Sequence, residues 1–167
     1  MAALAGAAAL AACSPGLDWR EVRVEPTALK ATLPCKPEQE SRQVAMAGRP
    51  VVLQALVCRA DGATYGVLFA DIGSPASAGD VLRQWQAASL ATMRGADARS
   101  TPFRPRGALE IPASVQVVAS GQRPDGSKVA SQAAYFARGP HVFQAVVYGT
   151  PLAPAMTQPF FDGLRFE

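Results

Sequence analysis

The sequence has a single histidine, His141, among its 167 residues. A hydrolytic triad needs a nucleophile, a base and an orienting group, so only this imidazole could serve as a histidine base. The chain also lacks a Gly-x-Ser-x-Gly elbow, a phosphate-binding loop and a Gly-rich dinucleotide turn. We therefore expect a protein that is not an enzyme, because enzymatic chemistry would require His141 to lie in a cleft beside an Asp or Glu.

Metal ligands are scarce as well. With one His, and with Cys35 and Cys58 expected to pair with each other, a transition-metal site would lack soft ligands, and no Asp-rich calcium loop is present. Carboxylates occur singly, and the candidates for a hydrolytic pair are Asp71 with Asp80 and Glu110 with Asp125. Structural roles are simpler, since Asp125 falls in an expected turn and Asp80 at an expected helix start. We expect neither a cofactor nor a metal site.

The chain has little charge and no long apolar run after its first residues. The formal net charge of +3 is too small to indicate binding to nucleic acid. Beyond residues 2–12, no apolar run approaches the roughly 20 residues that span a bilayer. A hydrophobic content of 49 % is close to the globular average, so the sequence predicts one ordinary domain, which we assign to residues 28–167.

What the sequence does have is an apolar leader. Residues 2–12 are all small or apolar, a length typical of the apolar region of a signal peptide. Leu10, Ala11, Ala12 and Cys13 resemble the lipobox of bacterial lipoproteins, in which the cysteine thiol takes a diacylglycerol. The resemblance implies a signal peptide over residues 1–12 and acyl chains such as palmitate on Cys13. Ser14 after the cysteine implies the periplasmic face of the outer membrane of a Gram-negative cell.

An alternative interpretation is an Ala-rich tail in which Cys13 is incidental. No Lys or Arg precedes Cys13, so the positive flank of a signal peptide rests on the terminal amine alone. The breakers Ser14, Pro15 and Gly16 directly after the cysteine favour a flexible tether over that alternative. We assign residues 13–27 to the lipidated tether and a first edge strand.

Acylation of Cys13 would leave two cysteines. In an oxidising compartment Cys35 and Cys58 then form an even pair, which predicts a disulfide; the alternative is two buried reduced thiols. A simple hairpin about Gly48 and Arg49 would place residue 39 opposite Cys58. The bridge would therefore need Pro34 and Pro37 to bend the chain.

Hydrophobic periodicity predicts strands on both sides of one long helix. The helix is expected over residues 76–93, with Ser77 and Asp80 as a weak capping box and an apolar stripe of Val81, Leu82, Trp85, Ala88 and Ala91 or Thr92. Asp61 and Gly62 predict a hairpin turn. A short helix is expected over residues 154–163 and a loop over 94–107. Strands are expected over residues 18–25, 28–33, 41–46, 51–59, 64–72, 113–121, 128–138 and 141–148.

This order predicts an α+β domain in which an antiparallel twisted sheet carries one long and one short helix. The chain resembles the PsbP-like α/β/α sandwich, shared by a photosystem II extrinsic subunit and small exported bacterial proteins. The resemblance rests on residues 29–34, on the helix with Trp85, and on residues 143–148 and 160–166. It covers most of the chain by element order, and a fold does not fix a function.

The loop expected over residues 94–107 is the one functional lead. It carries Arg94, Arg99, Arg104 and Arg106, and guanidinium groups bind phosphates and carboxylates at two points. An envelope protein, an anionic lipid or an acidic glycan could bind there; the alternative is ordinary solvated charge. We expect a non-enzymatic lipoprotein with a binding or accessory role. The rival functions are a carrier of lipid or another small ligand, with a cavity between sheet and helix, and an enzyme.

Overall fold

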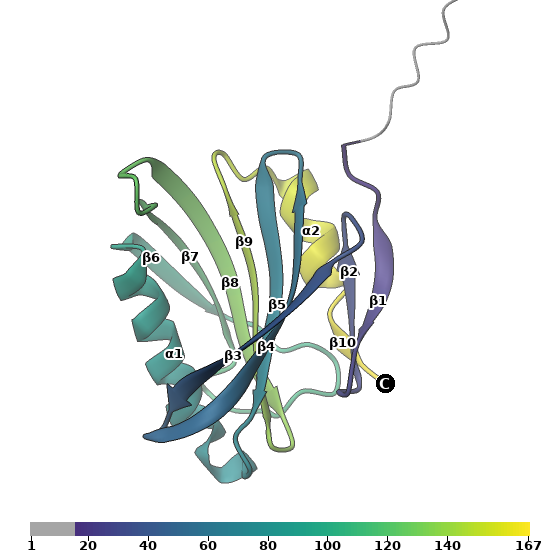
Figure 1. Ribbon diagram of the computed structural model, residues 1–167, viewed down its shortest axis with the longest axis vertical. Coiled ribbons are helices and arrows are strands. Elements are labelled where there is room, and N and C mark those ends of the chain that lie inside the picture. The colour runs from purple at the N-terminus through teal and green to yellow at the C-terminus, as the bar shows by residue number, and fades with distance from the viewer. Residues whose placement is uncertain (1–15) are drawn as a thin grey trace, which may run out of the picture.

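The computed structural model describes residues 16–167 (Figure 1). Cys13 and the expected signal peptide lie outside the described residues. Every pairing between named strands is antiparallel, and two α-helices accompany the strands. The expected α+β class is therefore confirmed, although the strands form two sheets instead of one.

The larger sheet has seven strands in the order β3-β4-β5-β9-β8-β7-β6. Its strands are β3 (Glu38–Met46), β4 (Arg49–Ala60), β5 (Ala63–Asp71), β6 (Ala96–Pro102), β7 (Val115–Gln122), β8 (Lys128–Arg138) and β9 (His141–Gly149). Asp61 and Gly62 join β4 to β5 with φ angles of 51° and 75°, the left-handed backbone that a tight hairpin requires. The hairpin expected at these two residues is confirmed.

The smaller sheet has the order β1-β2-β10 and consists of β1 (Arg20–Val24), β2 (Leu29–Leu33) and β10 (Arg165–Phe166). Helix α2 (Pro154–Asp162) packs against β2. In Figure 1 this sheet and α2 lie to one side of the seven-stranded sheet, and α1 (Ala78–Thr92) lies to the other. The first strand, assigned from sequence to the tether segment, is thus hydrogen-bonded into the folded body.

Alternate side chains of the larger sheet enter two separate cores. Phe143, Ala145 and Val147 of β9 belong to the core beneath α2 and the small sheet. Val142 and Val146 of the same strand belong to the core beneath α1. This two-faced burial explains the nearly continuous apolar sequence of β9, since a strand covered on both faces has no polar side to show.

The long helix begins differently from the sequence expectation. A 3-10 turn, η1 (Pro75–Ser77), precedes α1, and Ser74 accepts a hydrogen bond from the Ala76 amide at 3.3 Å. Ser77 makes no side-chain capping bond, so the expected capping box with Asp80 is wrong. Asp80 instead forms an ion pair with Arg83.

The segment expected to be a loop over residues 94–107 contains β6, an edge strand paired with β7. All seven of its residues are exposed. A strand with solvent on both faces needs no apolar alternation, and that alternation is the signal by which strands are read from sequence. The polar composition that indicated a loop therefore fits an exposed edge strand equally well.

Where α1 ends, β7 passes very close to it. The Gln122 amide donates to the Met93 carbonyl at 2.8 Å. A Cβ atom on the neighbouring Gly121 would lie 2.3 Å from the same carbonyl oxygen. Glycine at this position is therefore a packing requirement.

Candidate functional site

The structure joins Cys35 and Cys58 in a disulfide, with Cα atoms 5.9 Å apart. The predicted pairing is confirmed, and the reduced-thiol alternative is wrong. In the observed register the last pair of the ladder is Glu38 with Val57. Continuing that register would place Pro37 opposite Cys58, two positions before the residue that a simple hairpin had indicated. Cys35 follows β2 and Cys58 lies in β4, so the bridge ties the small sheet to the large one.

The four arginines expected to form one anionic site lie along an exposed edge instead. Arg94 follows α1 and Arg99 lies within β6, while Arg104 and Arg106 come after the strand. The strand itself has seven residues, so roughly 20 Å of extended chain separates the first arginine from the last two. The structure spreads the four arginines along this edge, and the binding of an anionic partner there stays a prediction.

Two of these arginines also have local contacts. Arg104 forms an ion pair with Glu110 at 3.0 Å. The backbone carbonyl of Arg106 accepts a hydrogen bond from the Phe166 amide at 2.9 Å. Both side chains remain exposed, as solvated loop charges do.

His141 begins β9 and is partly exposed. It lines a shallow depression of about 250 Å³ with Arg138, Pro26 and Phe166, and no carboxylate is among the lining residues. Asp71 lies opposite it in the strand register, yet Oδ1 of Asp71 accepts from the Gly73 amide at 2.8 Å. Within residues 16–167 no ion pair or hydrogen bond links this imidazole to a carboxylate.

The paired-carboxylate candidates are likewise engaged locally. Asp80 pairs with Arg83 and Glu110 with Arg104. Asp125 accepts from both the hydroxyl and the amide of Ser127, and the hydroxyl bond in particular lowers the pKa of its carboxyl group. Each carboxylate therefore has a turn or surface contact as its structural role.

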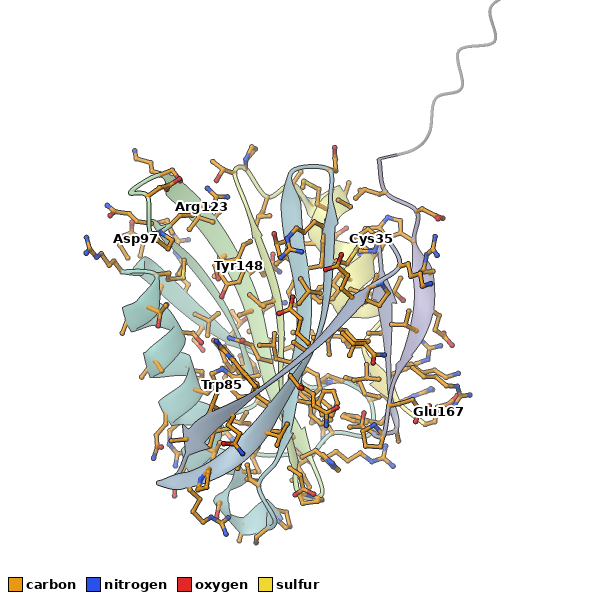
Figure 2. All side chains as sticks on the ribbon, in the orientation of Figure 1. Cys35, Trp85, Asp97, Arg123, Tyr148 and Glu167 are labelled. Carbon is orange, nitrogen blue, oxygen red and sulfur yellow. A yellow bond between two sulfur atoms is a disulfide. The ribbon has the colours of Figure 1, made fainter. Side chains whose placement is uncertain are left out.

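The candidate binding site that the sequence did not indicate is a groove between α1 and the β3–β4 hairpin, which we call the α1 groove. It has a volume of about 310 Å³ and opens to solvent. Its walls are formed by Arg42, Val44, Ala45, Met46, Ala47, Leu53, Val81, Gln84, Trp85 and Ala88. Figure 2 shows Trp85 between α1 and the hairpin.

A second hollow of about 220 Å³ adjoins the α1 groove on the same sheet face. The two share Arg42 and Leu53, and the second continues over Ala55, Val57 and Leu68. Together they form a mainly apolar trough along β4, with Glu40, Ser41 and Arg42 of β3 along one side. On this same face, helix α1 lies over β8 and β9 and leaves the trough along β4 open.

The second half of α1 is not buried at the positions that the predicted stripe indicated. Val81 and Leu82 are buried as the stripe predicted, but Ala88 and Ala91 are exposed. The positions that meet the sheet are instead Ser89, Leu90 and Met93. The expected apolar stripe is therefore right for the first half of the helix and wrong for the second.

A polar cluster beneath α1 fixes this orientation. The Gln144 amide on β9 donates to Ser89 Oγ at 3.0 Å and to the Tyr135 hydroxyl at 2.9 Å. Gln144 and Tyr135 are both buried, and burial raises the pKa of the Tyr135 hydroxyl. Trp85 packs edge-on against Tyr135, with ring centroids 6.3 Å apart. The wall of the groove that Trp85 forms is thus held by hydrogen bonds and by packing.

On the outer surface of the small sheet, five charged residues form a network that we call the Lys30 cluster: Glu21, Arg23, Lys30, Arg165 and Glu167. Lys30 Nζ lies 3.0 Å from Glu21 and also pairs with Glu167. Hydrogen bonds from Lys30 lower the pKa of both carboxyl groups, and its bond to Glu167 raises the pKa of the Lys30 ammonium group. Each charged side chain of the Lys30 cluster thus forms an ion pair with another member of the cluster.

No protein-family model matches the chain, and no curated protein matches it. In residues 16–167, no helix combines the length and the apolarity needed to cross a membrane. Across the same residues, no three His, Cys, Asp or Glu side chains gather where they could hold a metal ion. The function is therefore inferred from the surfaces described above.

Proposed function

We propose that the protein is a non-enzymatic lipoprotein of PsbP-like architecture. Acyl chains on Cys13 anchor it at the periplasmic face of the outer membrane, and its body binds an envelope protein through the α1 groove. The observation that carries the binding role is this open apolar groove, with Trp85 on one wall and Arg42 at the rim. The anchor rests on the lipobox resemblance of residues 10–13.

The residues of the groove suit a protein contact. Trp and Arg are the side chains most often found to dominate binding energy at interfaces, where they are surrounded by apolar contacts that exclude water. Trp85 is only partly buried and already held by Tyr135, so it loses little conformational freedom on binding. A partner that offers an apolar side chain beside a carboxylate matches both the floor and the rim of the groove.

The architecture supports the PsbP-like part of the proposal at the level of layers. One helix packs on each side of the seven-stranded antiparallel sheet, and the small sheet joins α2 on its side. Such layering hosts unrelated functions, so the binding role is argued from the groove alone.

The anchor is tested by Cys13→Ala in the full-length chain. Acyl chains contribute about 0.8 kcal/mol per buried methylene, so two or three together hold a protein firmly on a membrane. We expect the unaltered protein in the membrane fraction and the variant in the soluble fraction. Unchanged membrane association of Cys13→Ala would contradict lipidation at this residue.

The binding role is tested with a photo-crosslinking amino acid at Gln84, an exposed residue that lines the groove. In intact cells we expect a discrete adduct that disappears when Ala88→Trp fills the groove. The matched control is Ala87→Trp, which places the same side chain on α1 at an exposed residue outside the groove. An adduct that survives Ala88→Trp, or no adduct at all, would contradict partner binding in the groove.

A second candidate function, a carrier of lipid or another small amphiphile, is favoured by the position of the groove between helix and sheet. The apolar trough along β4 would take a hydrocarbon chain, and Arg42 would meet an anionic headgroup. Mass spectrometry of an organic extract of the purified protein distinguishes the two functions. A stoichiometric amphiphile that is absent from the Ala88→Trp variant would favour the carrier.

A further inference from the structure

The four edge strands of the two sheets differ in how they are protected. An unpaired strand edge is a template for another strand, and proteins usually shorten, bend or interrupt such edges. In the small sheet, β10 has two residues and β1 has five. In the large sheet, β6 is interrupted by a register shift between Ala96 and Arg99, by Asp97 at a φ of 52°, and by Pro102.

The remaining edge, β3, has none of these features. Its nine residues pair with β4 in one continuous register, without a shift or a proline. All nine are exposed or partly exposed, and no strand of residues 16–167 pairs with the far side of β3. The molecule therefore presents one long, regular, unpaired edge.

We propose that β3 pairs antiparallel with β3 of a second copy of the chain, with Ser41 on the twofold axis. In an antiparallel pair, residues directly opposite each other point to the same face of the sheet. Neighbouring residues of one strand point to opposite faces, so a strand that pairs with its own copy must have the twofold axis at a residue and not between two residues. Centring on Arg42 would set two guanidinium groups face to face, and centring on Glu40 would do the same with two carboxylates. Centring on Ser41 pairs Glu40 with Arg42 twice.

The charges on β3 make this register specific. Among the described residues, neither Glu40 nor Arg42 takes part in an ion pair. Opposite charges directly across two strands stabilise their pairing, and like charges oppose it. The same register places Gln39 opposite Gln43, where two amides can bond to each other. The charged side chains thus disfavour registers centred on residues 39, 40 or 42, where like charges would meet, yet they complement the reversed copy of β3 about Ser41.

Burial along β3 favours the same register. Residues 38–43 are exposed, whereas Val44 and Met46 are partly buried beside α1. Pairing centred on Ser41 joins residues 38–44 and stops short of Met46. The dimer would join two seven-stranded sheets edge to edge, and it does not depend on the lipid anchor, although it engages Arg42, which also lies at the rim of the α1 groove.

Cysteine cross-linking tests the pairing in the full-length chain. Opposed residues of an antiparallel pair have Cα atoms about 4.5–5.5 Å apart, within disulfide range, so oxidation of Ser41→Cys should give a covalent dimer. The unaltered chain controls for Cys13, and Thr101→Cys on the β6 edge is the matched negative control. Absence of the Ser41→Cys dimer, or equal cross-linking through Thr101→Cys, would overturn the proposal.

A charge-reversal cycle tests the register separately, by sedimentation velocity of the full-length protein in mild detergent. Glu40→Arg alone or Arg42→Glu alone places like charges opposite each other at two symmetric positions and should weaken the dimer by roughly tenfold or more. The double variant restores opposite charges and should restore the dimer. Both positions are exposed, and thermal unfolding checks that each variant is folded. A double variant as weak as the singles, or an unaltered protein that stays monomeric at tens of micromolar, would overturn the proposal.

Discussion

Two buried tyrosines in the large sheet offer a matched test of the packing on its two faces. Tyr65 is 0 % exposed and Tyr135 is 2 % exposed. The Tyr135 hydroxyl accepts from Gln144 at 2.9 Å, whereas the Tyr65 hydroxyl has no hydrogen-bond partner among residues 16–167. Burial raises the pKa of both hydroxyls. Removing each oxygen should therefore have opposite effects on stability.

The expected magnitudes follow from the contacts. Tyr135→Phe removes a buried hydrogen bond, which is worth about 1 kcal/mol, and it loosens the cluster that holds α1. Tyr65→Phe removes an oxygen that is desolvated without compensation, so the free energy of unfolding should stay constant or rise by up to about 1 kcal/mol. In urea denaturation of the three proteins, the free energies of unfolding of the two variants should therefore differ by about 1–2 kcal/mol. Equal destabilisation by both changes would refute the assigned environments of the two hydroxyls.

Three further outcomes are expected from the same structure. Reducing the Cys35–Cys58 bridge opens a loop with a sequence separation of 23, which should lower the free energy of unfolding by about 3 kcal/mol and Tm by roughly 6–12 °C. A thermal scan with and without reductant measures this shift, and equal Tm values would contradict it. Gly121→Ala should destabilise by about 1–3 kcal/mol in urea denaturation, because its Cβ would collide with the Met93 carbonyl, and a neutral result would contradict the close approach. Because Lys30 holds the pKa of its carboxylate partners below 4.5, their stabilisation is present above that pH and is lost as the pH falls through the lowered values. Lys30→Met should therefore lower Tm at pH 7 and have little effect at pH 2, and a pH-independent difference would count against the cluster.

The sequence was informative where burial imposes a period or a turn imposes a backbone angle. The hairpin at Asp61 and Gly62 could be predicted because few residues other than glycine adopt the left-handed region readily. The strand Lys128–Arg138 matches its expected bounds, because its side chains enter both cores. The disulfide followed from the even number of cysteines left after Cys13, before any distance was known.

Exposed strands could not be predicted in this way. β3 begins at Glu38, three residues before the expected strand, and β6 was expected to be a loop. All of β6 and residues 38–43 of β3 are exposed, and this exposure removes the apolar alternation there. β3 and β6 are the edges of the large sheet because of its strand order. That order is set by pairing between segments far apart in the chain, so the local sequence of a strand does not indicate it.

The α1 groove escaped prediction for a related reason. A helical stripe that includes Trp85 and Ala88 indicates a buried face, and nothing in its spacing shows where the covered surface ends. One contact of the buried face is with Gln144, which lies on β9 and bonds to Ser89 across 55 positions of sequence. A polar residue in an apolar strand was the available signal, because a buried amide needs partners.

The anchoring of the binding domain at the membrane through Cys13 can be measured from the mass of the N-terminal peptide of the protein isolated from bacterial membranes. We expect a peptide that begins at Cys13 and carries a diacylglycerol on sulfur, with a further acyl chain on the amino group. A peptide that begins upstream of Cys13 with an unmodified thiol would contradict it.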